Sequence, residues 1–292
     1  MKLLGRAAIV TGANRGLGKA IAASLIREGA DVMLAARDAD VLAATGEELA
    51  AARPTPDQKI VWQTADVSRA DDVERLVNGT VEKLGRLDIL VCNAGVYGPL
   101  GLIEEIAWDE WVQAIEINLL GTVLCCRSAV PIMRQQGSGK IIILSGGGAT
   151  APLPRVSAYA ASKAAVVRFG ETLAEEVKAS GIDVNSVAPG ALNTRLTDQI
   201  VEAGPEKVGK SLYERAVQWQ AGSATPLEVG ADLITFLASS ESDGITGRLI
   251  AAVWDPWREF PQQREKIAAS DVYTLRRIVP EDRGWQTETE KS

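Results

Sequence analysis

A regular alternation of short apolar segments with longer amphipathic segments constrains the fold of this chain more than any other feature. The apolar segments that we expect to form buried strands cover residues 7–10, 31–36, 60–66, 87–92, 140–144, 182–187 and 247–253. The segments that we expect to form helices lie between them, at 17–28, 39–52, 70–84, 108–136, 158–179 and 228–238. This order predicts one α/β domain over residues 1–292, with three layers and a doubly wound parallel sheet of roughly seven strands.

The composition disfavours several classes of function. The chain has 38 acidic and 31 basic residues and a net charge of −7, which argues against nucleic acid as a partner. It contains no histidine, which removes histidine bases and most catalytic zinc sites. Cys92, Cys125 and Cys126 form no CxxC pair, so we expect reduced thiols rather than a metal site or a disulfide framework.

The distribution of apolar residues predicts a cytoplasmic protein without a membrane partner. Residues 1–4 are followed at once by Gly5 and Arg6, too early for the apolar core of a signal peptide. In the sequence, no stretch approaches the ~18 uncharged apolar residues that a membrane helix needs.

A glycine-rich loop follows the first predicted strand and opens the first predicted helix. It reads Thr11-Gly-Ala-Asn-Arg-Gly-Leu-Gly18. Glycine permits a tight turn and a close approach of the backbone to a ligand, and the helix N-terminus offers free N–H groups to a pyrophosphate. A strand, such a loop and a helix in this order predict a dinucleotide site.

The spacing of these glycines resembles the TGxxxGxG pattern of the short-chain dehydrogenase/reductase family. Three further motifs occur in that family's order: Asn93-Ala94-Gly95, Tyr159-Ala-Ala-Ser-Lys163, and Pro189-Gly190 with Thr194. The resemblance covers about residues 5–254. It implies a Rossmann fold, and hydride transfer between a nicotinamide dinucleotide and a carbonyl or alcohol substrate. The cofactor contacts that it implies are Gly12, Asn14, Arg15, Gly16, Leu17, Gly18, Arg37, Asp66, Val67, Asn93, Ala94, Gly95, Tyr159, Lys163, Pro189, Gly190 and Thr194.

The end of the second strand indicates which nicotinamide cofactor is used. NAD enzymes of the family carry an acidic residue there for the ribose 2′-hydroxyl, and this chain has Ala36. Arg37 and Arg15 would give charge-assisted hydrogen bonds to a 2′-phosphate. We therefore predict NADP(H), with NAD(H) as the alternative. Asp66 resembles a family aspartate that contacts adenine, and helix capping near Ser68 is its other reading.

The resemblance assigns catalytic roles to three residues. Tyr159 would act as general acid and base, and Lys163 lies four residues later on the same helix face. A nearby ammonium favours the phenolate, so we expect Lys163 to lower the pKa of Tyr159 and to hold the nicotinamide ribose. Asn118 resembles the asparagine that holds a water linked to this lysine. A buried polar residue bonded to a neighbouring carbonyl is its alternative reading.

The fourth catalytic position departs from the family. The serine expected thirteen residues before Tyr159 is replaced by Gly146, and Ser145 lies one residue too early. A one-residue offset on a strand turns a side chain to the opposite face. The glycine-rich turn could swing Ser145 into place, or Tyr159, a water or a backbone N–H could suffice while Gly146 makes room for substrate. The third alternative is a catalytically weak NADP(H)-binding sensor or scaffold.

The remaining expectations concern substrate and assembly. By resemblance, residues 195–225 form a substrate lid, although their sequence reads as polar and irregular. Tyr97 and the loop through Gly101 form the opposite wall. The extension at 256–292 carries Trp257, Phe260, Tyr273 and Trp285 and would either cover the cleft or act as a strap that only stabilises the fold. The substrate would be a small carbonyl or alcohol. The helices at 108–136 and 158–179 would build a homotetramer or homodimer.

Overall fold

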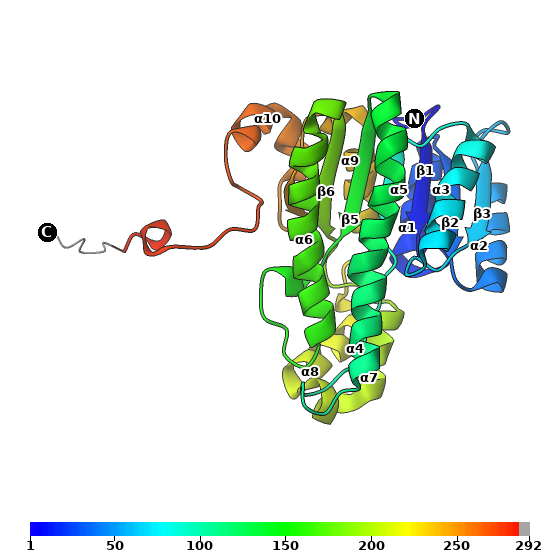
Figure 1. Cartoon of the computed structure of the whole chain (residues 1–292). Coiled ribbons are helices and arrows are strands. Elements are labelled where there is room, and N and C mark those ends of the chain that lie inside the picture. The colour runs from blue at the N-terminus through cyan, green and yellow to red at the C-terminus, as the bar shows by residue number, and fades with distance from the viewer. Residues whose placement is uncertain (286–292) are drawn as a thin grey trace, which may run out of the picture.

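The computed structural model describes residues 1–285 and shows a seven-stranded parallel sheet with helices on both faces (Figure 1). The strand order is β3-β2-β1-β4-β5-β6-β7. The strands are β1 (Ala7–Thr11), β2 (Asp31–Ala36), β3 (Ile60–Thr64), β4 (Ile89–Cys92), β5 (Gly139–Leu144), β6 (Ile182–Ala188) and β7 (Arg248–Ala251). The predicted doubly wound α/β fold is confirmed, and the strands begin and end within about two residues of the predicted bounds.

The sheet separates two apolar cores. On one face lie α1 (Gly16–Arg27), α2 (Ala39–Ala51) and α9 (Leu227–Ala238). On the other lie α3 (Ala70–Leu84), α5 (Gly121–Gln136) and α6 (Ser157–Val177). Every residue of β1 and β4 is buried, as expected for strands covered on both sides. This burial explains why the strands read as continuous apolar runs rather than as alternating patterns.

The strand order reverses beside β1, which lies between β2 and β4. The chain therefore leaves β1 toward one side of the sheet and leaves β4 toward the other. Loops that diverge at the carboxyl ends of the strands open a crevice at such a switch point. The fold thus brings the glycine-rich loop and the Asn93-Ala94-Gly95 motif together at one place.

The predicted helix at 108–136 is interrupted. It consists of α4 (Trp108–Ile115), a π-helical turn η1 (Glu116–Leu120) and α5. Short π turns inside α-helices concentrate at functional sites. The whole run is long and apolar enough to pass as a membrane span, which corrects our expectation that no segment approaches one. Its Cys125, Ala129 and Met133 are buried in the core beside the sheet, and core helices have the same composition.

The polar stretch at 195–225 is helical, so our prediction of irregular structure is wrong. It contains α7 (Arg195–Val208), α8 (Lys210–Gln218) and a π-type turn η4 (Trp219–Ser223). Gly204 has φ 78° and ψ 164° and breaks α7 just before Pro205. Glycine and proline side by side hid the helical period on either side of them.

The C-terminal extension packs on the edge of the sheet and then leaves the body. Trp257 is buried in the 3₁₀ turn η6 (Trp257–Glu259), and Phe260 is buried at the start of α10 (Phe260–Ala268). The Arg248 guanidinium donates to the carbonyls of Ile267, Ser270 and Val272 at 2.7–2.9 Å. After Leu275 the chain projects away from the body and carries the short 3₁₀ helix η7 (Pro280–Arg283), the red turn to the left of the body in Figure 1.

Candidate active site

A cleft with a volume of 1490 Å³ opens at the carboxyl ends of the strands. Every cofactor residue predicted from the sequence lines it, from Gly12 to Thr194, as do Ser145 and Gly146. Asn118 lies behind the wall rather than on it. The sequence motifs, spread over some 180 residues, therefore meet in one place.

The glycine loop has the tight geometry that a pyrophosphate needs. Gly12 and Gly16 have φ of 65° and 52°, where other residues are strained. A Cβ on Gly18 would lie 2.1 Å from the Gly12 carbonyl oxygen, so only glycine fits. The Asn93 side-chain amide donates to the carbonyls of Thr11 and Gly12 and ties the loop to β4. No side chain caps the N-terminus of α1, which leaves its N–H groups facing the cleft.

The far end of the cleft contains both arginines and an acidic residue that the sequence analysis missed. The Arg15 guanidinium lies 3.2 Å from a carboxylate oxygen of Asp38, and both side chains are half exposed. Asp38 also caps α2 by accepting from the Val41 N–H. Arg37 is exposed beside them. Asp66 accepts hydrogen bonds from the Ser68 N–H and hydroxyl, at 3.0 and 2.7 Å.

Tyr159 and Lys163 lie side by side on the first turns of α6. The Lys163 Nζ donates to the Leu144 carbonyl at 2.7 Å and lies 5.6 Å from the centroid of the Tyr159 ring. Burial lowers the pKa of Lys163 to about 8 and raises the pKa of Tyr159 well above its usual value. Burial, and after it the neighbouring Tyr97, set the direction of this shift, which is opposite to the lowering of the pKa that we expected from Lys163.

Asn118 holds the loop that follows β4. Its side-chain amide accepts from the Val96 N–H and donates to the Val96 carbonyl, both at 2.8 Å. It also donates to the Ser162 hydroxyl at 2.9 Å. Asn118, in the π turn, is thus buried and joins the β4 loop to α6 by hydrogen bonds. Its carboxamide oxygen would lie 3.2 Å, and Lys163 Nζ 3.6 Å, from a Cβ built on Gly95.

Position 146, and not Ser145, faces the tyrosine. A Cβ on Gly146 would lie 2.6 Å from the Tyr159 hydroxyl oxygen. The Ser145 hydroxyl is buried and donates to the Lys163 carbonyl at 3.2 Å. The one-residue offset thus has the effect expected on a strand, and the turn does not bring Ser145 to the tyrosine hydroxyl. The space beside that hydroxyl is left without a side chain from β5.

The end of the cleft where we expected the substrate is bounded by α7, α8, the Tyr97 loop and the extension. Arg195 and Arg215 reach the lining, as do Leu212 and Trp219, whereas the basic residues Lys207 and Lys210 do not. Tyr97 forms the opposite side and packs edge-to-face on Tyr159. From beyond β7, the lining includes Trp254, Asp255, Tyr273 and Thr274.

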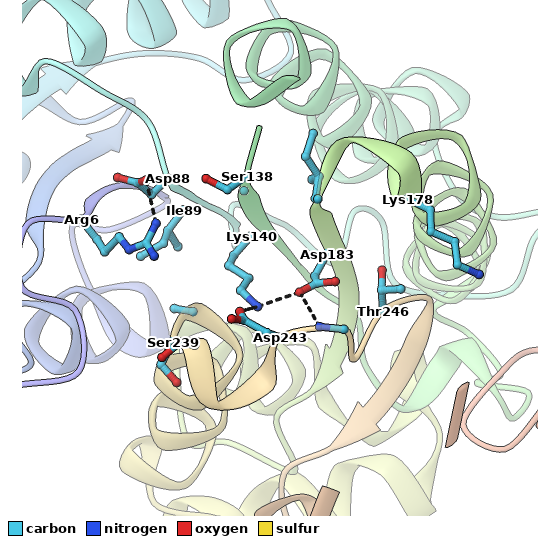
Figure 2. A pocket seen from close by; sticks show the side chains of 16 residues that line it. Arg6, Asp88, Ile89, Ser138, Lys140, Lys178, Asp183, Ser239, Asp243 and Thr246 are labelled. Carbon is cyan, nitrogen blue, oxygen red and sulfur yellow. Dashed lines mark hydrogen bonds and ion pairs between the residues drawn. The ribbon is translucent and has the colours of Figure 1, made fainter. Parts of the chain in front are cut away.

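A second hollow, of 400 Å³, lies at the opposite end of the sheet (Figure 2). Lys140 points into it and pairs with Asp183 and Asp243, both at 2.7 Å. Arg6 pairs with the buried Asp88 across its rim at 3.2 Å. These cations already have carboxylate partners, so the hollow contains two groups of ion pairs, one between the starts of β1 and β4 and one between β5 and β6. In residues 1–285, no cluster of histidine, cysteine and carboxylate residues has the makings of a metal site.

Known proteins with the same organisation are oxidoreductases. A family model described as short chain dehydrogenase matches residues 6–204. A glucose 1-dehydrogenase of Gluconobacter oxydans is 36% identical over 250 residues, which cover 85% of this chain and 91% of that protein. A 2-dehydro-3-deoxy-L-rhamnonate dehydrogenase (NAD(+)) of Sphingomonas is 33% identical, covering 81% of this chain and 89% of that protein. The crystal structure of levodione reductase matches with a TM-score of 0.78 at 29% identity, over 85% of this chain and 96% of that one.

Proposed function

Because this chain belongs to the short-chain dehydrogenase/reductase family and is an oxidoreductase of the CH–OH group, we propose that it transfers hydride between NADP(H) and a ketone, an aldehyde or the matching alcohol. The observation that carries the proposal is the convergence of the glycine loop, Tyr159 and Lys163 on one cleft. The nicotinamide, when bound, supplies or accepts the hydride.

Tyr159 handles the proton in this proposal. When hydride reaches the carbonyl carbon, the phenol donates its proton to the carbonyl oxygen, and in the reverse direction the phenolate takes it back. Burial keeps the phenol protonated, which suits the reductive direction. Lys163, with its pKa near 8, can lose and regain a proton close to neutral pH and so recharge the site. Asn118 positions the β4 loop beside this pair.

The proposed preference for NADP(H) is supported by the two arginines at the far end of the cleft. A 2′-phosphate there would accept hydrogen bonds from Arg37 and Arg15. The Asp38 carboxylate already forms an ion pair with Arg15, at 3.2 Å. Because a half-exposed ion pair of this kind contributes little, Arg15 can exchange Asp38 for a phosphate at low cost. NAD(H) would leave both guanidinium groups without that partner.

Assembly and location complete the proposal. We propose a homodimer or homotetramer built on α4, α5 and α6, which lie side by side in Figure 1. Trp108 and Leu120 on this surface are 67% and 48% exposed, which supports burial against another subunit. The three cysteines are free and buried, in keeping with the proposed cytoplasmic location.

The test is turnover with both cofactors. NADPH and NADH oxidation is followed at 340 nm across ketones, aldehydes and keto-sugars, with Tyr159→Phe as the matched variant. We expect carbonyl-dependent oxidation with higher kcat/KM for NADPH, and at least about a 10²-fold loss in Tyr159→Phe, the size expected for removal of a general acid. Wild-type turnover that survives in Tyr159→Phe would contradict the proposed role, and higher kcat/KM for NADH would contradict the cofactor preference.

A further inference from the structure

The space beside the Tyr159 hydroxyl lacks a hydrogen-bond donor from β5. Gly146 faces that hydroxyl, and the serine next to it is bonded to the backbone of α6. A carbonyl that receives hydride develops negative charge on its oxygen, and two donors stabilise this charge better than one. A second donor would therefore have to come from another part of the cleft wall around Tyr159.

Tyr97 is the side chain that packs on Tyr159. The ring centroids lie 4.8 Å apart with an interplanar angle of 66°, an edge-to-face contact. Both rings belong to one apolar cluster with Val156 and Leu153, and both line the same cleft. Tyr97 thus approaches Tyr159 from the β4 loop, while Gly146 approaches its hydroxyl from β5.

The backbone on both sides of Tyr97 is fixed. Val96 exchanges two hydrogen bonds with the Asn118 side chain, each 2.8 Å long. Gly98 has φ 73°, and a Cβ there would lie 2.6 Å from the Ala114 side chain, so this residue packs tightly on α4. A side chain held between two such anchors keeps its position, as a group that acts in a transition state must.

The Tyr97 hydroxyl is available as a donor. Within residues 1–285 it forms no hydrogen bond with the protein, although the side chain is largely buried. Burial raises the pKa of this phenol to about 12, so it keeps its proton throughout the neutral range. A neutral phenol that cannot readily ionise can donate a hydrogen bond without competing for the proton that Tyr159 transfers.

We propose that the Tyr97 hydroxyl donates a hydrogen bond to the oxygen of the reacting carbonyl and supplies the contact that Gly146 cannot. The inference rests on the proposed function and adds a second catalytic residue to it. In reduction, hydride adds to the carbonyl carbon, Tyr159 transfers its proton to the oxygen, and Tyr97 retains its own. The site then contains two phenols with different roles. Tyr159 transfers its proton, and Tyr97 only polarises the carbonyl by a hydrogen bond.

The test compares Tyr97→Phe with Tyr213→Phe on the carbonyl that the wild type reduces best. Tyr97→Phe keeps the ring and its packing on Tyr159 and removes only the hydroxyl, so folding is preserved. We expect kcat to fall about 10–100-fold with KM changed less than threefold, because the lost bond forms mainly in the transition state. Tyr213→Phe makes the same chemical change on α8, outside the cleft lining, and should leave kcat unchanged.

The kinetics of Tyr97→Phe separate hydrogen-bond donation from a role in shape alone. Tyr97→Phe with kcat within twofold of wild type would overturn the inference. A rise in KM with unchanged kcat would also overturn it, since Tyr97 would then contribute only to substrate binding. Tyr159→Phe tests the proposed function separately, so the two ideas can fail independently.

Discussion

Lys163 shows at the scale of one residue how a proposed catalytic role and the stability of the fold oppose each other. Its side chain is buried, and among residues 1–285 its Nζ donates to a single acceptor, the Leu144 carbonyl. Desolvation lowers its pKa from 10.5 to about 8. The folded protein therefore holds a proton on Lys163 less tightly than the unfolded chain does. Near neutral pH this difference lowers the free energy of unfolding.

We predict that Lys163→Met is inactive but more stable than the wild type at pH 7, by about 2 kcal/mol. The lowered pKa corresponds to about 3 kcal/mol, and the lost hydrogen bond offsets about 1 kcal/mol of it. Below pH 8 both states of the wild type carry the proton and the penalty is complete. Between pH 8 and 10.5 only the unfolded chain still binds it, so wild-type stability rises and the advantage of the variant disappears.

The measurement for Lys163→Met is urea denaturation of cofactor-free protein at pH 7 and at pH 10. Lys178→Met, at an exposed position paired with Glu175, is the control and should change the free energy of unfolding by less than ~0.5 kcal/mol. A Lys163→Met protein that is less stable than the wild type at pH 7 would show that the desolvation penalty is small.

At the residue scale, the sequence predicts a side chain's orientation correctly where the geometry of the backbone alone determines it. The orientation of positions 145 and 146 follows from the two-residue period of a strand, and the structure has Gly146 toward Tyr159 and Ser145 away from it. The pKa of Tyr159 depends on depth of burial, which no motif encodes. The contact of Arg15 with Asp38 joins two loops that are distant in sequence, and neither residue type signals it.

At the scale of elements, the alternation of strands and helices could be read because buried parallel strands and amphipathic helices have distinct patterns. The sheet and the helices that cover it were predicted on that basis. The π turn at Glu116–Leu120 could not be, since one extra residue in a turn leaves the apolar pattern almost unchanged. The lid helices were missed because Gly204 and Pro205 interrupt a mostly polar segment.

The contact between β7 and the extension depends on one side chain, and we predict that Arg248→Ala destabilises the protein by about 3 kcal/mol. Its guanidinium donates to the carbonyls of Ile267, Ser270 and Val272, and removal would take three charge-assisted hydrogen bonds from this contact, one of them buried. Arg258→Ala serves as the control, because Arg258 is exposed, stacks on Trp257 at 4.0 Å and forms a long ion pair of 3.9 Å with the half-exposed Asp232. The free energy of unfolding of each variant is measured in urea. Equal losses in the two variants would contradict the prediction.

At the scale of the whole molecule, the extension has two parts with different relations to the body. Residues up to Leu275 pack on the sheet edge and on α6, where the Leu275 N–H donates to Glu171 at 2.6 Å. The following arm closes on itself, since Arg276 forms two hydrogen bonds of 2.7 Å with Asp282. Ile278 and Trp285 on the arm are 59% and 69% exposed.

We predict that two truncations separate these parts. A chain ending at Arg276 should unfold within about 1 °C of the full-length protein, because residues 277–285 are exposed or only half-buried. A chain ending at Pro256 loses the buried side chains of Trp257, Phe260 and Ile267, worth about 5 kcal/mol or more together. Thermal unfolding by circular dichroism measures both. Equal melting temperatures for the two truncations would contradict the division.

The hydrogen bond between the extension and β7 also affects the tendency of the protein to aggregate. The Leu249 N–H, on the outer edge of the last strand, donates to the Tyr273 carbonyl at 2.7 Å. An open edge strand is a template for pairing with any other extended chain, and such pairing begins many aggregates. The extension occupies that edge with its own backbone. Proteolytic cleavage between Ala252 and Tyr273 would therefore uncover a surface prone to intermolecular strand addition, even if the catalytic residues stayed in place.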